Sequence, residues 1–523
     1  MAINVAEDSL DWALAHAERY GDTDVFPIPF EFQAIRFSWE EVRTRLSRRD
    51  LDTRPVEELR RCIAPKGLYS YRVVTQLDPI DFLLYTALTY EIGEHLESIR
   101  VPAGENIVHS SRFNPSADGR MFDQDYNYSS FLIKCRAIAE DGSYSYVVVA
   151  DISDFYPRIY LHRIESALQL GTAREDISRG ILKLIKGWND NVSYGIPVGS
   201  AASRLIAEAT LDDIDKYLIS TDTTYCRYSD DFRIFCKSKV DAYAKLELLA
   251  SILFENHGLF LQPSKTEIVD MDKFEKKYLE TPVTTELLSL RERFGDILDS
   301  LGIEDLYTEI DYDELEDEEK KAIDSLNLHG LLMDQIGKEV VDTGILKFVL
   351  SRMGQLNQHE GIEEIFNNIN KCYHLVPNIV SYIKLLKDIE GENRDYISGK
   401  AINIISSSII GQLPFNRCWI LSLFSDNIMR TQVQNLAQMF NRYTDTFSQR
   451  KVILSLGCMR QDYWFRNMKS SVMHLSPWSR RALLVASSCM AADEVKAWYG
   501  SINRRLDELE NIVIDWVKSY AFQ

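Results

Sequence analysis

The spacing of hydrophobic residues predicts two structurally different parts of the chain that meet near residue 280. In the first part, helical and strand patterns alternate. The run "YSYVVVADI" (Tyr144 to Ile152) is typical of a buried strand, and "YCRYSDDFRIF" (Tyr225 to Phe235) predicts two short strands joined by a tight turn. A long helix is expected to open at Asp78-Pro79, because proline is tolerated in a first helical turn.

After about Glu280, strand patterns become rare and helical patterns recur. Ile362, Ile365, Phe366 and Ile369 follow the i, i+3, i+4, i+7 rule of an amphipathic helix. Helix pairs at roughly even spacing suggest a stacked α-helical repeat, although the sequence contains no strict repeat. We therefore expect an α+β part over residues 1–280, an acidic helical connector over 281–330 and an all-α helical repeat domain over 331–523.

Composition and charge narrow the possible functions only partly. The chain has 523 residues, 45% of them hydrophobic, which is enough for two or three domains. Its formal charge of −20 argues weakly against a nucleic-acid partner, since phosphate binding requires Lys and Arg. However, the segment from Glu304 to Glu319 holds ten acids and no base, and a basic stretch, "RTRLSRRDLDTR", lies elsewhere. That acidic segment is a solvated linker or, alternatively, a surface that mimics or repels nucleic acid.

The eight cysteines are scattered and include no C-x-x-C pair, which indicates neither a zinc site nor a disulfide framework. The N-terminal segment lacks the pattern of a signal peptide, and no apolar run approaches the ~18–20 residues of a membrane span. We expect a cytoplasmic protein with no membrane partner.

Three aspartates suggest a metal site. Asp151 ends the predicted buried strand, and Asp230 and Asp231 occupy the turn between the two short strands. Like charges this close repel each other, so either solvent surrounds them or a cation binds there. An Asp-Asp pair in a turn is common by itself. If the strands pair, however, the three carboxylates meet, and oxygen ligands of this kind suit two Mg²⁺ ions that promote nucleotidyl transfer.

The motifs around these aspartates resemble those of reverse transcriptases. "DISDFYP", "GIPVGSAASRLIAE" and "YSDD" follow the order and spacing of the family's palm motifs, and residues 60 to 280 fit the whole pattern. With "YGDTDVFPIPFEF" near the N-terminus and a helical second part, the chain resembles the bacterial abortive-infection and defence-associated reverse transcriptases. The resemblance implies a right-hand polymerase with fingers and palm, followed by a HEAT-like helical repeat domain in place of the thumb.

The resemblance also implies roles for the palm residues. The metal ligands would be Asp151, Asp230 and Asp231, together with the backbone carbonyl of Ile152. Tyr156 would be the bulky gate that excludes a 2′-hydroxyl, with Phe155 as a core residue beside it. The backbone N–H of Asp154 would lie near the triphosphate, while its side chain serves as a helix cap.

Further positions are implied to contact substrate. Lys66 and Arg72 would hold the triphosphate, and either could instead be a solvated surface residue. Lys265 would donate a proton to the leaving pyrophosphate, with a plain surface lysine as the alternative. In "GIPVGS", Gly195 and Gly199 would let the backbone approach the base pair, and Pro197 would be a further substrate-binding position. Val198 stands where many members have Gln, so the mode of template binding stays open.

The function implied is a reverse transcriptase-type DNA polymerase in bacterial antiphage defence. It would use dNTPs and Mg²⁺ to make DNA. Synthesis would copy a non-coding RNA or need no template, and in some relatives it starts from a hydroxyl of the protein. We also expect a homo-oligomer. One alternative is an RNA-dependent RNA polymerase, which Tyr156 disfavours. Another is a catalytically dead palm with a helical interaction scaffold, which predicts an incomplete set of acids. An intron maturase would be strongly basic.

Overall fold

The computed structural model describes residues 3–22, 25–171, 174–190, 192–279, 289–290, 293–294, 320, 323, 326–387, 389 and 391–521. The acidic segment 304–319 and most of the predicted connector lie outside these residues. Contacts divide the chain into two compact units. The first comprises Met1–Thr23, Ile28–Arg60 and Thr75–Thr285, and the second comprises Asp24–Pro27, Arg61–Val74 and Glu286–Gln523. The expected division into residues 1–280, 281–330 and 331–523 stays a prediction. It separates parts of different proposed function, whereas the two compact units are separated by their contacts alone.

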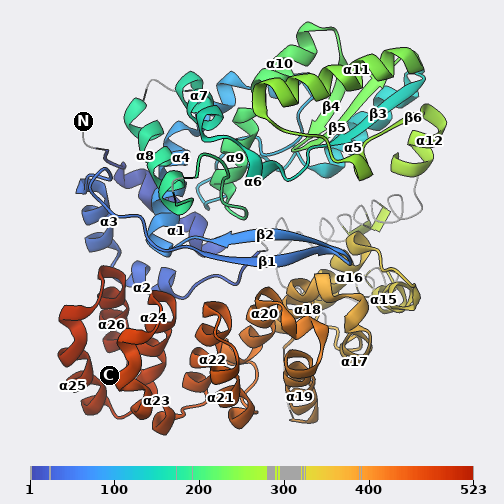
Figure 1. Cartoon of the computed structure of the whole chain (residues 1–523). Helices are drawn as coiled ribbons and strands as arrows, with labels where there is room; N and C mark the ends of the chain where they lie inside the picture. Colours follow the sequence, from blue (N-terminus) through green and yellow to red (C-terminus); the bar gives the residue numbers. More distant parts are fainter. Residues whose placement is uncertain are drawn as a thin grey trace. The chain divides into compact units, whose positions relative to one another are not determined.

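The first unit is built around a long buried helix, α4 (Pro79–Ile99), labelled in Figure 1. As predicted, it opens at Asp78, whose side chain accepts a hydrogen bond from the Ile80 N–H at 3.1 Å. Its neighbours α1, α7, α8 and α9 pack against it and leave little of its surface open. The helices and short turns of this unit are α1 (Glu7–Arg19), α2 (Glu31–Phe37), α3 (Trp39–Arg48), η1 (Ala103–Glu105), α5 (Tyr128–Glu140), α6 (Phe155–Arg158), α7 (Leu161–Gly171), α8 (Glu175–Trp188), α9 (Ala201–Thr210), α10 (Asp212–Ser220), α11 (Lys239–Ile252), η2 (Leu253–His257), η3 (Pro263–Lys265), α12 (Met271–Phe274) and η4 (Glu275–Leu279).

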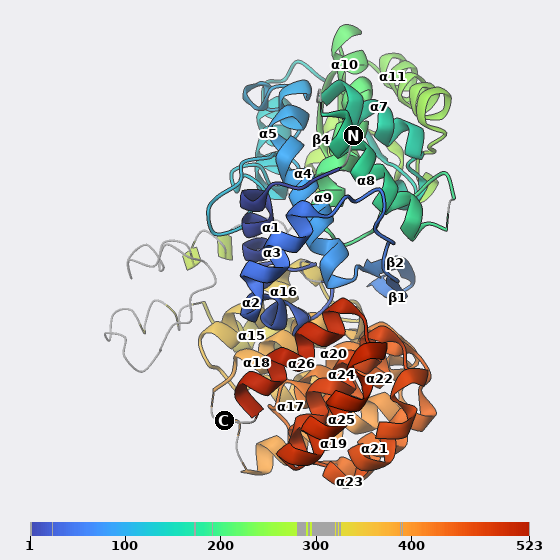
Figure 2. The ribbon, with the colours of Figure 1, turned by 90° about the vertical axis from the view of Figure 1, so that its left-hand side faces the viewer.

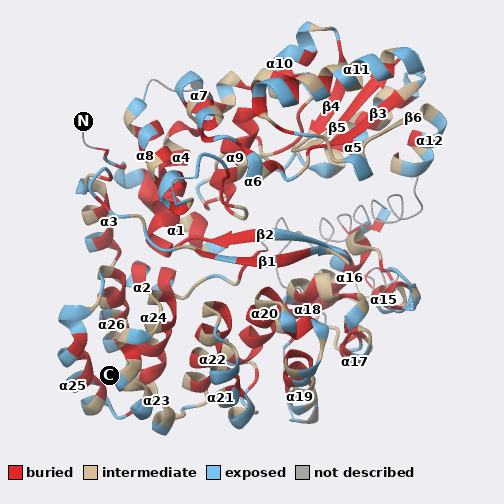
Figure 3. Ribbon diagram, in the orientation of Figure 1, coloured by how far each residue is buried: buried red, intermediate tan, exposed pale blue. Residues whose placement is uncertain are grey.

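The main sheet confirms the predicted strands. Among the described residues it runs β4-β5-β3-β6 and is antiparallel throughout, with β3 (Tyr146–Asp151), β4 (Thr224–Tyr228), β5 (Asp231–Cys236) and β6 (Glu267–Asp270). β3 and β5 are buried over nearly their whole length, as Figure 3 shows, because both faces of the sheet are covered.

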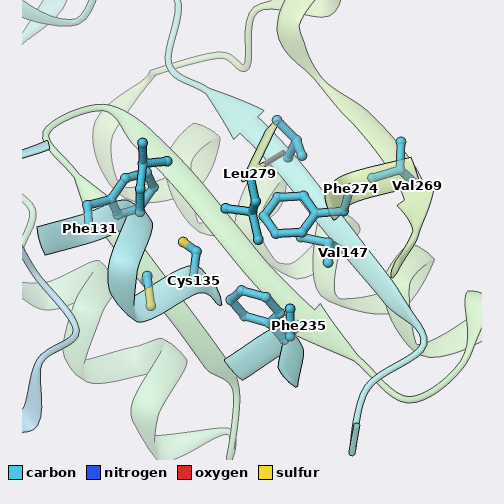
Figure 4. Close-up of a cluster of buried hydrophobic side chains, with 11 residues drawn as sticks. Phe131, Cys135, Val147, Phe235, Val269, Phe274 and Leu279 are labelled. Carbon is cyan, nitrogen blue, oxygen red and sulfur yellow. The ribbon is translucent and has the colours of Figure 1, made fainter. Parts of the chain in front are cut away.

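Alternate side chains of these strands point to opposite faces of the sheet. Val147 and Val149 face one side, where Phe131 and Cys135 of α5 and Phe274 of α12 close a hydrophobic cluster (Figure 4). On the other side, α11 packs against β3 and β5 (Figure 1). Helices thus cover both faces of the sheet.

Two further strands, β1 (Arg60–Gly67) and β2 (Ser70–Gln76), form a separate hairpin with a two-residue loop. Most of this hairpin groups with the second unit.

In the rest of the second unit, the secondary-structure elements that the structure describes are helices joined by turns and loops. The amphipathic stripe that starts at Ile362 is confirmed as helix, since all four of its apolar positions are buried in α17 and the turn after it. Along the chain, α16, α18, α20, α22, α24 and α26 each contact the next of this series (Figures 1 and 2). The helices and short turns are α15 (Leu328–Gly337), α16 (Thr343–Gln355), α17 (Ile362–Asn367), η6 (Ile369–Lys371), η7 (Tyr373–Leu375), α18 (Val376–Leu385), α19 (Gly391–Ser407), η8 (Ile409–Gln412), α20 (Pro414–Ser425), α21 (Val433–Arg442), α22 (Thr446–Cys458), α23 (Asp462–Met468), η9 (Lys469–His474), α24 (Pro477–Ala486), η10 (Ser487–Cys489), α25 (Ala492–Ile502), η11 (Asn503–Arg505) and α26 (Glu508–Ala521).

All eight cysteines lie in described ranges and are free thiols, which agrees with the absence of a disulfide framework in the sequence. Over the described ranges, none of the helices has both the length and the apolar character that a bilayer span requires.

Candidate active site

The antiparallel register of β3 and β5 brings the three predicted aspartates to one edge of the sheet. Asp151 is the direct partner of Asp231 across the two strands. The backbone carbonyl of the neighbouring Asp230 accepts a hydrogen bond from the N–H of Ile152 at 3.1 Å. Residues that are far apart in the sequence are therefore adjacent in space.

The electrostatics of this edge are unfavourable for three free carboxylates. The Asp151 side chain is only 8% exposed. Burial raises the pKa of Asp231 above its usual value, the charge of Asp151 raises it further, and Arg233, at 3.5 Å from the carboxylate, offsets only part of this. A positive charge placed here relieves the repulsion.

Lys265 already supplies one positive charge. Its Nζ lies 2.7 Å from Oδ2 of Asp151, and the lysine side chain is 48% exposed. Burial tends to lower the pKa of Lys265, but the hydrogen bond to Asp151 and the nearby acidic charges outweigh it, so the pKa is raised. The ammonium group is thus protonated and ion-paired, not merely solvated. Its predicted role as a proton donor is not tested by this geometry.

The donor set at this edge fits a hard divalent cation. The available ligands are carboxylate and carbonyl oxygens, which suit Mg²⁺. Without a bound cation, burial disfavours the ionised form of Asp231. Over the described residues, however, no group of three or more His, Cys, Asp or Glu side chains has a ready metal-binding arrangement. The four ligands expected from the sequence therefore stay a prediction.

Tyr156 follows β3 at the start of the short helix α6. It is half-buried, its hydroxyl interacts with the side chain of Ser229 in the turn between β4 and β5, and burial raises its pKa. Phe155 packs beside it, with ring centroids 5.4 Å apart, and is only 3% exposed. The gate candidate therefore borders the aspartate turn, while Phe155 belongs to the core.

The expectation that the Asp154 side chain caps a helix is wrong. Asp154 occupies the N-cap position of α6, yet within the described residues its side chain accepts no capping hydrogen bond. Its backbone is in the left-handed region, with φ of 48°, whereas a capping residue adopts an extended conformation.

The "GIPVGS" loop packs against the turn that carries Tyr156. The Gly195 N–H donates to the carbonyl of Ile159 at 2.8 Å, and the Ile196 N–H donates to that of Tyr156 at 3.1 Å. Gly195 has φ of 95°, and a Cβ there would lie 3.3 Å from the carbonyl oxygen of Pro157. This glycine is required by the close approach of the two backbones.

Other members of the loop are also defined. Pro197 is buried, and Gly199 has φ of 135°, which disfavours any side chain. The Val198 carbonyl accepts a hydrogen bond from the Thr75 N–H at 3.1 Å. Whether this loop contacts a base pair stays a prediction.

Lys66 and Arg72 lie on the β1–β2 hairpin, and both residues are exposed. The hydroxyl of Tyr373 donates to the carbonyl of Leu68 at the tip of this hairpin and lies 3.4 Å from the hydroxyl of Tyr71. The hairpin tip is therefore fixed by a residue from the helical part of the second unit. Because the two units are described separately, the structure does not relate Lys66 and Arg72 to the aspartates.

A buried charged cluster lies beneath the aspartate turn and was not predicted from the sequence. It consists of Arg100, Ser110, Glu208, Asp215 and Arg227, all of which are almost fully buried. Its signal was present in the sequence as an arginine inside the strand "YCRY" and a glutamate inside the apolar helix "SRLIAEAT". A buried charge requires an oppositely charged or hydrogen-bonding partner, so this arginine and this glutamate could have been predicted to form such contacts.

Comparison with known proteins agrees with the site. Residues 65–283 match the family described as "Reverse transcriptase (RNA-dependent DNA polymerase)". No curated protein matches the sequence. Among solved structures, the telomerase of Candida albicans, determined in complex with a TWJ fragment of telomeric RNA, aligns with 73% of this chain and 69% of its own. At 12% identity and a TM-score of 0.31, that likeness is too weak to indicate the fold or the function of this chain. The family match supports the prediction of an RNA-directed DNA polymerase.

Proposed function

We propose that this chain, which carries a reverse transcriptase domain over residues 65–283, adds deoxynucleotides to a 3′-hydroxyl in bacterial antiphage defence. The observation that carries the polymerase proposal is the pairing of Asp151 with Asp231 beside Asp230 at one edge of the buried sheet. The defence role rests on the resemblance of the sequence motifs.

Two Mg²⁺ ions would be held by Asp151, Asp230, Asp231 and the carbonyl of Ile152. When bound, they supply activation of the 3′-hydroxyl and charge compensation for the leaving pyrophosphate. The raised pKa of Asp231, which burial causes first, supports this proposal, since a bound cation would favour the ionised carboxylate.

Lys265 holds a proton on Nζ beside Asp151. In the proposed reaction this proton neutralises the departing pyrophosphate, and Lys66 and Arg72 bind the phosphates of the incoming nucleotide. An arginine can make a forked contact with a phosphate, whereas a lysine acts as a point charge.

Tyr156 would select the sugar. A ring at this position fills the space that a 2′-hydroxyl would need, and sterics alone suffice for this selection. The contact of its hydroxyl with Ser229 would keep the ring in register with the aspartate turn.

The second unit would replace the thumb. Consecutive contacts along the series from α16 to α26 support a HEAT-like stack of helix pairs, in which each repeat packs on its neighbours. We propose that this stack also mediates a homo-oligomer. Synthesis either copies an associated RNA or proceeds without a template, and a hydroxyl of the protein is a candidate primer.

The test is nucleotide incorporation by the purified full-length protein. Single labelled dNTPs and rNTPs are offered with Mg²⁺, with and without primed RNA or DNA templates. The wild type and an Asp272→Ala control, which alters an exposed aspartate of α12, are expected to incorporate dNTPs, and Asp230→Ala is expected to be inactive. A preference for rNTPs would favour an RNA polymerase. No incorporation with any primer or template would leave a non-catalytic scaffold.

A further inference from the structure

The turn that carries Asp230 has an unusual backbone at Ser229. This residue has φ of 54°, which non-glycine residues adopt infrequently and usually only where their surroundings enforce it. Both sides of the residue are held. Its N–H donates to the Ser110 hydroxyl at 2.7 Å, and its carbonyl accepts from Nη1 of Arg227 at 2.8 Å.

Glu208 joins these two supports. Its Oε1 accepts from the Ser110 hydroxyl at 2.5 Å, and its Oε2 accepts from Nη1 of Arg227 at 2.9 Å. The exposed fractions of Ser110, Glu208 and Arg227 are 3%, 3% and 0%, so water does not compete for these contacts. A single carboxylate therefore links the residues that hold Ser229 on either side.

The remaining contacts keep this carboxylate and arginine in place. Asp215 accepts from Nε of Arg227 at 3.0 Å, and Arg100 donates to Oε2 of Glu208 at 3.1 Å. In addition, the Arg227 N–H donates to the carbonyl of Ile107 at 2.8 Å, which ties β4 to the segment that leads to Ser110. Two arginines and two acids thus form one buried group, which Arg100 extends to Glu97 at 2.8 Å.

Stability alone is a poor reason for such a group. Desolvation of buried ion pairs costs about as much as their attraction returns, and apolar residues of similar volume are often at least as stabilising. Apolar side chains cannot, however, fix the orientation of the two peptide groups that flank a residue, because this requires directional hydrogen bonds. The position of the group, directly before Asp230, indicates what it orients.

We propose that Ser110, Glu208 and Arg227 are positioning residues that fix the peptide groups on either side of Ser229 and thereby aim the carboxylate of Asp230 at the edge occupied by Asp151. Because the Ser229 side chain also interacts with Tyr156, the same group sets the position of the sugar gate relative to the metal ligands. The inference rests on the proposed polymerase function, since Asp230 must bind a metal for its aim to matter.

The test compares Ser110→Ala, Arg227→Lys and Glu208→Gln with Arg112→Lys in the full-length protein. Arg112 is an equally buried arginine that binds Glu97 at 2.8 Å. Among the contacts of the described residues it meets the positioning group through Glu97 and Arg100, and not at Glu208 or Ser229. Circular dichroism and thermal unfolding establish which variants fold. Ser110→Ala removes one hydroxyl only and serves if the charge variants do not fold.

Two readouts separate positioning from simple destabilisation. In the incorporation assay, the positioning variants are expected to require more Mg²⁺ for half-maximal rate and to lose about 10- to 100-fold in kcat, with the KM for dNTP little changed. In thermal unfolding without nucleotides, Mg²⁺ is expected to raise Tm less in these variants than in the wild type. Arg112→Lys should lose stability without either change.

The outcomes distinguish the two proposals. If the folded positioning variants keep the Mg²⁺ dependence of the wild type in both readouts, the positioning role is refuted. If the wild type itself incorporates no nucleotide, the proposed function fails. The Mg²⁺ effect on Tm then still decides whether this group orients a metal ligand.

Discussion

Replacing Lys265 by glutamine tests whether the edge formed by Asp151, Asp230 and Asp231 requires a positive charge. The variant keeps a polar side chain of similar reach but removes the ammonium group that lies 2.7 Å from Asp151. At that distance, Coulomb's law gives about 6 kcal/mol with an effective dielectric constant of ~20. This figure is an upper limit for the loss.

Solvent reduces the loss considerably. Exposed ion pairs contribute ~0–1 kcal/mol, whereas removal of one partner from a buried pair costs about 3–5 kcal/mol. Here the carboxylate is 8% exposed and the lysine 48%, so the pair lies between these cases. We expect Lys265→Gln to lower the free energy of unfolding by about 1–2 kcal/mol without Mg²⁺, which corresponds to a fall in Tm of roughly 2–8 °C.

Mg²⁺ should reverse this loss. A cation bound at Asp151 replaces the missing ammonium charge, so saturating Mg²⁺ is expected to stabilise the variant more than the wild type and to narrow the difference in Tm. Lys273→Gln is the matched control, since this lysine is 73% exposed and 3.5 Å from Asp270. It should change Tm little, with or without Mg²⁺. A Lys265→Gln deficit that Mg²⁺ leaves unchanged would refute the reasoning.

Three further substitutions test the sugar gate, the hairpin contact and the aspartate turn. Tyr156→Ala should lower the preference for dNTPs over rNTPs, measured as the ratio of kcat/KM, by roughly tenfold or more, whereas Tyr156→Phe should retain it because the ring remains. Tyr373→Phe should free the hairpin tip by about 1 kcal/mol, seen as faster hydrogen exchange at the amides around Leu68, and unchanged exchange would contradict the contact. Asp231→Asn should stabilise the Mg²⁺-free protein at pH 7. Because the folded-state pKa of Asp231 is raised, stability falls as pH rises from the unfolded pKa through the folded one, and the variant should lose this dependence in unfolding titrations between pH 4 and pH 7.

Local signals account for the parts of the fold that the sequence predicted. Asp78-Pro79 marks the start of α4 because a cap and a proline act within a single turn. The apolar run ending at Asp151 predicts β3, since a strand covered on both faces must be apolar throughout. The proximity of Asp151 to Asp231 could be predicted only by assuming that the two strands pair, because no local sequence signal defines the register.

Long-range contacts and unusual backbone conformations were not accessible in the same way. Glu208 and Arg227 were visible as charges in apolar surroundings, but nothing in their local sequence names Ser110 as the third member. The cap predicted at Asp154 failed because the turn after β3 forces a left-handed backbone there. The β1–β2 hairpin groups with the helical unit, and one of the contacts there comes from Tyr373, some three hundred residues further along the chain, which no local signal in the hairpin identifies.

The most direct test of the central claim, that the three aspartates together bind divalent cations, is anomalous X-ray diffraction from crystals of the full-length protein grown with Mn²⁺ and a non-reactive dNTP analogue. The account predicts anomalous peaks that are shared by the carboxylates of Asp151 and Asp230, with the ammonium of Lys265 displaced from Asp151. An ordered triphosphate with no Mn²⁺ at these carboxylates would contradict it.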